Sequence, residues 1–164
     1  MIKFGTGGWR AVIGDDFTKA NIQLLAQGLV NKMKSEGVIE QGIVMGYDRR
    51  FLSKEAMQWA AEVFAAAQIK AYLINKSSPT PLVMFYVMKH DFPYGMMITA
   101  SHNPAIYNGI KVFTAGGTVM PTRSRRRIWR TTLPTSHRTA SARLHMRMEK
   151  RRAISRRSIR SMST

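Results

Sequence analysis

The residues best suited to chemistry follow a short apolar run in the second half of the chain. Residues 96–98 read Met-Met-Ile, and residues 99–104 continue as Thr-Ala-Ser-His-Asn-Pro. An apolar run that ends in small and polar residues closed by a proline predicts a buried strand that leads into a loop. The hydroxyl of Ser101 and the imidazole of His102 would then lie at the end of a strand, where α/β proteins commonly carry functional side chains.

Two chemistries are open to a serine in this loop. Acyl transfer would need a base held by an acid, and no acid near Ser101 in sequence makes a Ser-His-Asp triad evident. His102 adds little, because neighbours on an extended chain point in opposite directions. Phosphoryl transfer needs positioning, cations and a metal, which suits a loop with the amide of Asn103 and with Lys111 close by. From these residues alone, a turn serine bonded to its own backbone remains an alternative.

Residues 99–104 resemble, position for position, the phosphoserine loop of the α-D-phosphohexomutases, the phosphoglucomutase/phosphomannomutase family. In that family the serine gives its phosphoryl group to a hexose phosphate, which makes a hexose 1,6-bisphosphate, and then takes the other phosphoryl group back. The resemblance implies an isomerase that works by intramolecular phosphoryl transfer, with Ser101 as the phosphoryl carrier. It also implies that the phosphate on Ser101 is a ligand of Mg²⁺, that a hexose 1,6-bisphosphate is an activator, and that His102 and Asn103 shape the surroundings of the phosphate.

Two further motifs resemble the family in the same order along the chain. Residues 5–10, Gly-Thr-Gly-Gly-Trp-Arg, are similar to the family's opening Gly-Thr-(Ser/Gly)-Gly-x-Arg, which implies that Arg10 lies in the active site near the phosphoserine. Lys111 matches the active-site lysine of a Gly-x-Lys segment, which implies a phosphate-binding cation and a candidate acid or base. Without the resemblance, a tight turn and a solvated strand lysine remain the alternatives.

A further short motif, Gly-x-Asp-x-Arg at residues 46–50, is similar to the turn after the family's second strand. We expect Asp48 and Arg50 to brace this turn internally. Direct contact with substrate is the other interpretation of the pair.

Helical patterns occur at three places between these motifs. The predicted N-caps are Thr18, Ser53 and Thr80, each followed by apolar residues at three- and four-residue spacing. Pro81 would take the first position of the third helix, and His90 would lie at its end.

Strand patterns alternate with the helices. We predict strands at residues 9–13, 42–47, 71–74, 96–98 and 110–113, the last after a tight turn at Asn108-Gly109. Strands that alternate with helices predict an α/β fold, here a three-layer α/β/α sandwich with a mostly parallel mixed sheet.

The composition restricts the class of protein. A chain of 164 residues is long enough for one domain with a substantial core. There is no cysteine, which excludes a disulfide framework and a thiolate metal site and makes the cytoplasm the expected compartment. The first residues lack the apolar core of a signal peptide, and no apolar run approaches the length of about 18 residues expected of a membrane span, so no membrane association is expected.

The positive charge is concentrated at the end of the chain. Residues 1–117 hold 12 Lys and Arg and 8 Asp and Glu, for a net charge of +4, whereas residues 118–164 hold 14 basic residues and one acid, for +13. No helical or strand period organises this Arg- and Ser-rich segment, so we expect it to be disordered. The predicted domains are a phosphohexomutase α/β/α domain I at residues 1–117 and a basic tail at residues 118–164.

Three interpretations of the tail are open. A basic arm could bind nucleic acid through its phosphates, with the α/β part as a scaffold, although Trp129 is the only aromatic residue there for stacking on bases. Translation out of frame is another, because codons permitted for residues 119–124 read two bases along as Asp-Ala-Asp-Glu-Val. An unrelated fusion is the third. A cationic tail of any origin would bind nucleic acid non-specifically.

The resemblance also implies what residues 1–117 would lack. In the family, the remaining Mg²⁺ ligands, the sugar-discriminating loop and a further phosphate-binding loop lie in three later domains. We therefore expect this chain to be a truncated mutase that shows no measurable mutase activity by itself. The sequence does not specify which hexose phosphate is the substrate.

Overall fold

The computed structural model describes residues 4–5, 7–121 and 124, which all belong to one compact unit. Its helices are α1 (Lys19–Ser35), α2 (Ser53–Ala66) and α3 (Thr80–Lys89), with short 3₁₀ turns at Ile39–Gln41 and Ala115–Gly117. Its strands are β1 (Phe4–Gly5), β2 (Gly8–Val12), β3 (Ile43–Tyr47), β4 (Ala71–Leu73), β5 (Tyr94–Ile98), β6 (Tyr107–Thr114) and β7 (Thr118–Val119).

These strands form a single mixed sheet in the order β1-β2-β6-β5-β3-β4, with β7 paired to β6. β3 pairs in parallel with β4 and β5, whereas β6 pairs antiparallel with both β5 and β2. β2, β3, β4 and β5 therefore run in one direction, and β6 runs against them between β2 and β5. The predicted α/β class with a mixed sheet is confirmed, although parallel pairing is confined to β3–β4 and β3–β5.

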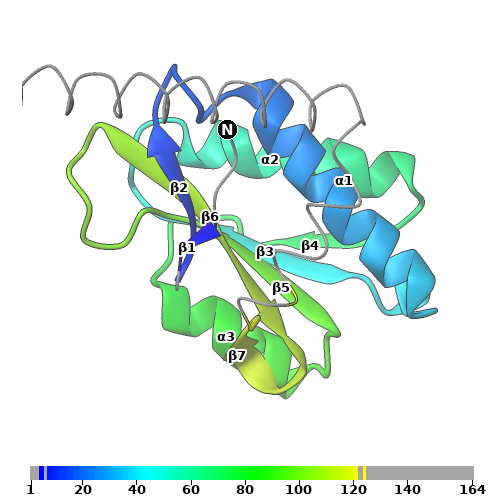
Figure 1. Ribbon diagram of the computed structural model, residues 1–164. Helices are drawn as coiled ribbons and strands as arrows, with labels where there is room; N and C mark the ends of the chain where they lie inside the picture. The colour runs from blue at the N-terminus through cyan, green and yellow to red at the C-terminus, as the bar shows by residue number, and fades with distance from the viewer. Residues whose placement is uncertain (1–3, 6, 122–123, 125–164) are drawn as a thin grey trace, which may run out of the picture. The chain divides into compact units, whose positions relative to one another are not determined.

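Helices cover both faces of the sheet, with α1 and α2 on one side and α3 on the other (Figure 1). Leu29 and Phe64 belong to the apolar cluster on the side of α1 and α2, and Val83 belongs to the cluster on the side of α3. Successive residues of β5 serve the two clusters in turn, because Met96 lies in the first and Met97 in the second. A strand buried on both faces explains why the run ahead of Ser101 is apolar without alternation.

The ends of two helices lie where the sequence predicts them. Thr18 is the N-cap of α1, and its Oγ1 accepts a hydrogen bond from the backbone N–H of Asn21 at 3.3 Å. His90 is the C-cap of α3 and stacks on Tyr86, with ring centroids 5.6 Å apart.

The predicted N-caps of the other two helices are wrong by one residue. Ser53 is the first residue of α2, and Leu52 is the N-cap with φ of 61°. The hydroxyl of Ser53 donates to Asp48 at 2.8 Å, so it is not available to cap its own helix. Thr80 is likewise the first residue of α3, after an extended Pro79.

The predicted tight turn at Asn108-Gly109 is also wrong, because both residues lie inside β6. A Cβ at Gly109 would lie 2.2 Å from the carbonyl oxygen of Trp9 and 3.0 Å from that of Thr99. The glycine is there because two neighbouring backbones approach it closely, and this requirement does not differ in sequence from that of a turn.

The packed domain extends beyond Gly117, where we expected it to end. Thr114 and Thr118 are partners in the β6–β7 pairing. Met120 is fully buried, and its backbone N–H donates to the carbonyl of Val112 at 2.9 Å. The remaining part of the predicted disordered tail, residues 122–123 and 125–164, lies outside the described residues.

Candidate functional site

The site lies where β3 and β5 end side by side. Tyr47 and Ile98, the last residues of these parallel strands, are partners in the register, and the N–H of Asp48 donates to the carbonyl of Ile98 at 3.1 Å. Because both strands run in the same direction, the segments after them leave the sheet at the same edge. We call residues 48–52 the β3 loop and residues 99–106 the β5 loop.

Ser101 lies in the β5 loop with an exposed side chain. Its φ of 58° places it in the left-handed region, which residues other than glycine rarely occupy. Its N–H donates to Thr99 Oγ1 at 2.9 Å, and its carbonyl accepts a hydrogen bond from Arg50 Nη2 at 2.9 Å. His102 is exposed as well. The backbone of this segment is therefore fixed, while the hydroxyl and the imidazole face solvent.

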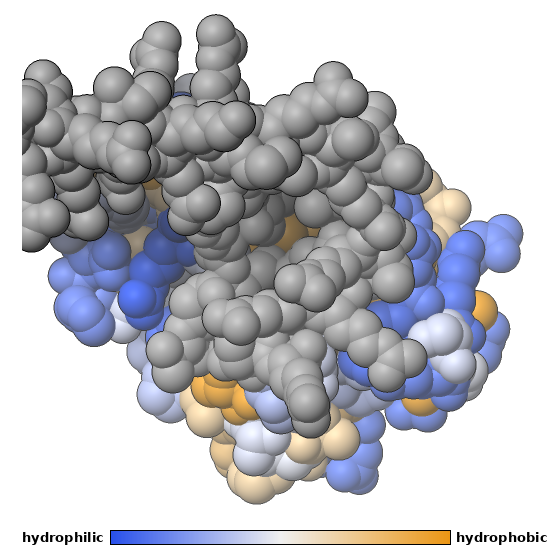
Figure 2. Space-filling view, in the orientation of Figure 1, coloured by the Kyte–Doolittle hydropathy of each residue, from blue (hydrophilic) through white to orange (hydrophobic). Residues whose placement is uncertain are grey.

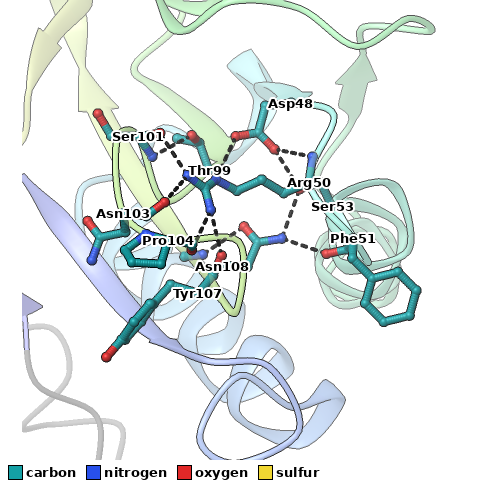
Figure 3. Close-up of polar contacts among 11 residues, drawn as sticks. Asp48, Arg50, Phe51, Ser53, Thr99, Ser101, Asn103, Pro104, Tyr107 and Asn108 are labelled. Carbon is teal, nitrogen blue, oxygen red and sulfur yellow. Dashed lines mark hydrogen bonds and ion pairs between the residues drawn. The ribbon is translucent and has the colours of Figure 1, made fainter.

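The guanidinium of Arg50 fills the inside of the β5 loop (Figure 3). Nη1 donates to the carbonyls of Pro104 and Tyr107 at 2.9 and 3.0 Å, and Nη2 donates to those of Ser101 and Asn103 at 2.9 and 2.6 Å. On its other side, Nε lies 3.6 Å from Asp48 Oδ2. One side chain of the β3 loop thus binds four backbone oxygens of the β5 loop and the start of β6.

A second polar network ties the β3 loop to α2 and β6. Asp48 Oδ1 accepts hydrogen bonds from the backbone N–H of Arg50 at 2.9 Å and from the hydroxyl of Ser53 at 2.8 Å. The buried Asn108 donates through Nδ2 to the carbonyl of Phe51 at 2.9 Å and to the hydroxyl of Ser53 at 2.8 Å. These contacts fix the position of Arg50, which in turn binds the backbone of the β5 loop (Figure 3).

The sequence indicated only part of this arrangement. The ion pair between Asp48 and Arg50 agrees with the internal bracing that we expected. The four carbonyl partners of Arg50 and the roles of Ser53 and Asn108 were missed. A usable signal existed, since loops that follow adjacent parallel strands meet at one edge, but the register that makes β3 and β5 neighbours is not visible in the sequence.

Arg10 and Lys111 lie on the neighbouring strands β2 and β6. Arg10 is the register partner of Gly109 in β6. The carbonyl of Gly109 accepts a hydrogen bond at 2.9 Å from the N–H of Thr99, the first residue of the β5 loop. Gly109 therefore lies between Arg10 and the start of this loop. The Gly7-Gly8 turn packs against both cations, because a Cβ at Gly7 would lie 3.5 Å from Arg10 Nη2 and one at Gly8 would lie 3.1 Å from Lys111 Cγ.

The two cations are in an environment that suits an anion. Within the described residues, Arg10 Nε is buried without a hydrogen-bond partner. Burial, and secondly the positive charge of Arg10, lower the pKa of Lys111. An anionic group between these side chains would supply a partner for Nε and would favour the charged form of the lysine.

A protein-family model described as phosphoglucomutase/phosphomannomutase, alpha/beta/alpha domain I, matches residues 1–138. The chain belongs to the phosphoglucomutase/phosphomannomutase family. The match of this domain I reaches past residue 117, as the packing of β7 and Met120 does.

Individual members of the family agree with this assignment. The chain is 39% identical over 123 residues to a probable phosphoribomutase of Schizosaccharomyces pombe, and 40% identical over 124 residues to a phosphoglucomutase of Staphylococcus aureus strain MRSA252. These matches cover 71% and 74% of this chain but only 21% and 22% of the relatives, so the chain spans about a fifth of their length.

Solved structures of the family have the same fold. The crystal structure described as "putative phosphomannomutase" from Thermus thermophilus matches with a TM-score of 0.74 and 32% identity, over 81% of this chain and 30% of that one. A phosphoglucomutase/phosphomannomutase family protein from Burkholderia thailandensis matches with a TM-score of 0.69 at 20% identity, over 80% of this chain and 30% of that one, which supports the fold alone.

Metal-ligating side chains are not grouped together in the described part of this domain I. No group of three or more His, Cys, Asp or Glu side chains that could hold a metal ion occurs among the described residues. The carboxylate nearest to the β5 loop in the network, Asp48, is engaged by Ser53 and by the backbone and side chain of Arg50.

A separate hollow of about 600 Å³ lies beside α3. Its lining residues include Tyr72, Tyr86, His90 and Phe92. Figure 2 shows hydrophobic surface over the end of the molecule where α3 lies, and Phe85 and Met88 of this helix are exposed. Lys70 lies over the ring of Tyr72 and Lys89 lies over the ring of Phe85, so this surface carries cations as well. Within the described residues, no helix is long and apolar enough to cross a membrane.

Proposed function

We propose that Ser101 is the phosphoryl carrier of a sugar-phosphate mutase, which interconverts hexose 1-phosphate and hexose 6-phosphate through a hexose 1,6-bisphosphate. The observation that supports this function best is an exposed serine hydroxyl on a fixed backbone, which follows a strand beside two partly buried cations, Arg10 opposite Gly109 and Lys111 opposite Met97. The names of the relatives, phosphoglucomutase and phosphoribomutase, support sugar phosphates as the substrate class.

The proposed step exchanges one phosphorus–oxygen bond for another. A hydroxyl oxygen of the sugar phosphate attacks the phosphorus on Ser101, the bond from phosphorus to Ser101 Oγ breaks, and the proton of the sugar hydroxyl ends on Oγ. Arg10 and Lys111 would stabilise the negative charge of the phosphoryl group. Because its pKa is lowered, Lys111 gives up a proton more readily than an ordinary lysine, which suits it to relay the transferred proton. His102 and Asn103 would line the phosphate.

Phosphoryl uptake by the 164-residue chain tests this proposal. We expect incubation with glucose 1,6-bisphosphate in Mg²⁺ buffer to add one phosphoryl group, detected by intact mass and located on Ser101 by peptide mapping. Ser101→Ala should abolish the uptake, whereas the matched change Ser77→Ala, in the loop after β4, should leave it unchanged. Uptake that survives Ser101→Ala would contradict the assignment of the carrier.

Complete turnover is a separate question. Turnover needs a sugar phosphate to be positioned against the phosphoryl group, and this chain spans about a fifth of the length of its curated relatives. Loss of positioning alone can remove roughly 7–11 kcal/mol of barrier reduction. In a coupled assay with glucose 1-phosphate, we therefore expect the chain to give no more product than its Ser101→Ala variant.

The nucleic-acid alternative gains no support from the fold or from the comparisons. It depends on the basic tail, and nearly all of that tail lies outside the described residues.

A further inference from the structure

The β5 loop has little apolar packing of its own. Ser101, His102 and residues 104–106 are exposed. Two backbone hydrogen bonds close turns within the loop, from Asn103 N–H to the Ala100 carbonyl at 3.1 Å and from Tyr107 N–H to the Pro104 carbonyl at 3.0 Å. A segment with exposed side chains and few internal bonds belongs to the part of a protein that opens most easily.

The side chain of Arg50 fills the inside of the β5 loop in place of apolar packing. Its side chain is only 16% exposed, and its two terminal nitrogens bind four carbonyl oxygens on both sides of Pro104. A guanidinium presents its donors in a rigid planar fork, whereas the ammonium of a lysine is a single point with three donors. A lysine at this position would keep the charge but could not reach all four oxygens with the same geometry.

The stem of Arg50 is itself fixed, so the guanidinium cannot follow a moving loop. Its backbone N–H donates to Asp48, whose other partner, Ser53, is bonded to the buried Asn108 of β6. The network therefore runs from Asn108 of β6 through Ser53 and Asp48 to Arg50, and Arg50 binds the β5 loop. A displacement of the β5 loop away from the β3 loop would therefore break the bonds that Arg50 makes.

The hydrogen bond to the carbonyl of Ser101 matters most for chemistry. Ser101 has a left-handed backbone, which costs free energy for a residue with a side chain and persists only when its surroundings impose it. Thr99 fixes the peptide group before Ser101, and Arg50 fixes the one after it. Together these two contacts fix the direction in which the side chain of Ser101 leaves the backbone.

We propose that Arg50 is a positioning residue, which holds the β5 loop in the conformation that presents the Ser101 hydroxyl. Its contribution to phosphoryl transfer rests on the function proposed above, while its control of the loop does not. Arg50 acts through backbone carbonyls and not through contact with the phosphate, which distinguishes it from Arg10 and Lys111.

Amide hydrogen exchange of the 164-residue chain tests the control of the loop. The informative variant is Arg50→Lys, and the matched control is Arg49→Lys, the same change at the exposed neighbour, whose Nε lies 3.4 Å from Ser77 Oγ. We expect Arg50→Lys to lower protection of the Ser101, Asn103 and Tyr107 amides by about tenfold more than that of the β3 amides, which is the size of one lost hydrogen bond from a charged donor. Equal loss in the loop and in β3, or no loss in either, would overturn the proposal.

Phosphoryl uptake from glucose 1,6-bisphosphate tests the consequence for chemistry. With the loop loosened, we expect uptake by Arg50→Lys to slow by about a hundredfold, the cost that a small misplacement of a reacting group can have, and uptake by Arg49→Lys to equal that of the wild type. A loosened loop with unchanged uptake would overturn the positioning role. A wild-type chain that takes up no phosphoryl group would count against the proposed function, and the exchange experiment would still decide whether Arg50 controls the loop.

Discussion

The β3 loop and the β5 loop leave the sheet at the same edge but use their residues in opposite ways. The β3 loop turns the side chains of Asp48 and Arg50 into the molecule, where they bind groups of α2 and of the β5 loop. The β5 loop turns its backbone inward and leaves Ser101 and His102 exposed. One loop supplies the support and the other is free to supply the reactive groups.

Two serines make the contrast clear. Ser53, at the end of the β3 loop, is 1% exposed, and its hydroxyl donates to Asp48 and accepts from Asn108. Ser101 is exposed, and its backbone, not its hydroxyl, makes the contacts that hold it. A serine whose hydroxyl is occupied by structure is not available for transfer, so the carrier must be held by other atoms.

Removing the link from the β3 loop to β6 should lower the free energy of unfolding most. Asn108→Ala would remove the donor to the carbonyl of Phe51 and to the hydroxyl of Ser53, and the acceptor for the N–H of Gly109. We expect the free energy of unfolding to fall by about 3 kcal/mol, since each unsatisfied buried polar group costs about 1–3 kcal/mol and the losses overlap. Urea denaturation measures this change. A loss below about 1 kcal/mol would show that the buried amide is not the link.

The support side of the comparison is tested at Ser53. Ser53→Ala removes the donor to Asp48 and the acceptor for Asn108, so we expect a loss of about 1–2 kcal/mol in the free energy of unfolding. Urea denaturation of this variant beside Ser101→Ala gives the direct contrast. Equal losses at the two serines would contradict the difference between the loops.

Changes to the exposed Ser101 of the β5 loop should have little effect on the free energy of unfolding. Ser101→Gly removes the hydroxyl and relieves the left-handed backbone at φ of 58°, so we expect the free energy of unfolding to stay equal or to rise by up to about 1 kcal/mol. Phosphoryl uptake should be lost completely in the same variant. A marked destabilisation would mean that the Ser101 hydroxyl has a structural partner that the fold does not account for.

The smallest effect concerns the cations beside the β5 loop and depends on pH. The folded chain holds the Lys111 proton less tightly than the unfolded chain, because its pKa is lowered by burial and by Arg10 from a usual value of 10.5. The charged lysine therefore destabilises the fold below its lowered pKa, and this penalty disappears as the pH rises towards the usual value, so stability should rise with pH across that window. Lys111→Met should remove the rise. Urea midpoints measured from about pH 7 to about pH 10 compare the two slopes, and identical slopes would contradict the lowered pKa.

The sequence predicted those features that depend on local pattern. The apolar run at residues 96–98, the cap at Thr18 and the alternation of helices and strands were sufficient for the three-layer fold, and Ser101 was identified by its own loop. Two of the errors, at Ser53 and Gly109, fall where a long-range contact gives the residue a role other than its local preference. The role of Arg50 could not be predicted, because it depends on the strand order that brings β3 next to β5.

The place of β6 in the sheet has a consequence for how the chain acquires its fold. Ile110 of β6 is the register partner of Trp9 in β2 on one side and of Ile98 in β5 on the other. β2, near the start of the chain, is therefore joined to β5 through β6. During synthesis β2 emerges long before β6 and stays without this partner until β6 has been made, and pairing between strands so far apart in sequence is slow. Until then β2 has an open edge, and the support for Ser101 does not exist, because Asn108 enters with that same strand. A chaperone that shields nascent chains would therefore affect the yield of this domain chiefly before residue 110 is released, which pulse-labelling of arrested chains of increasing length would detect.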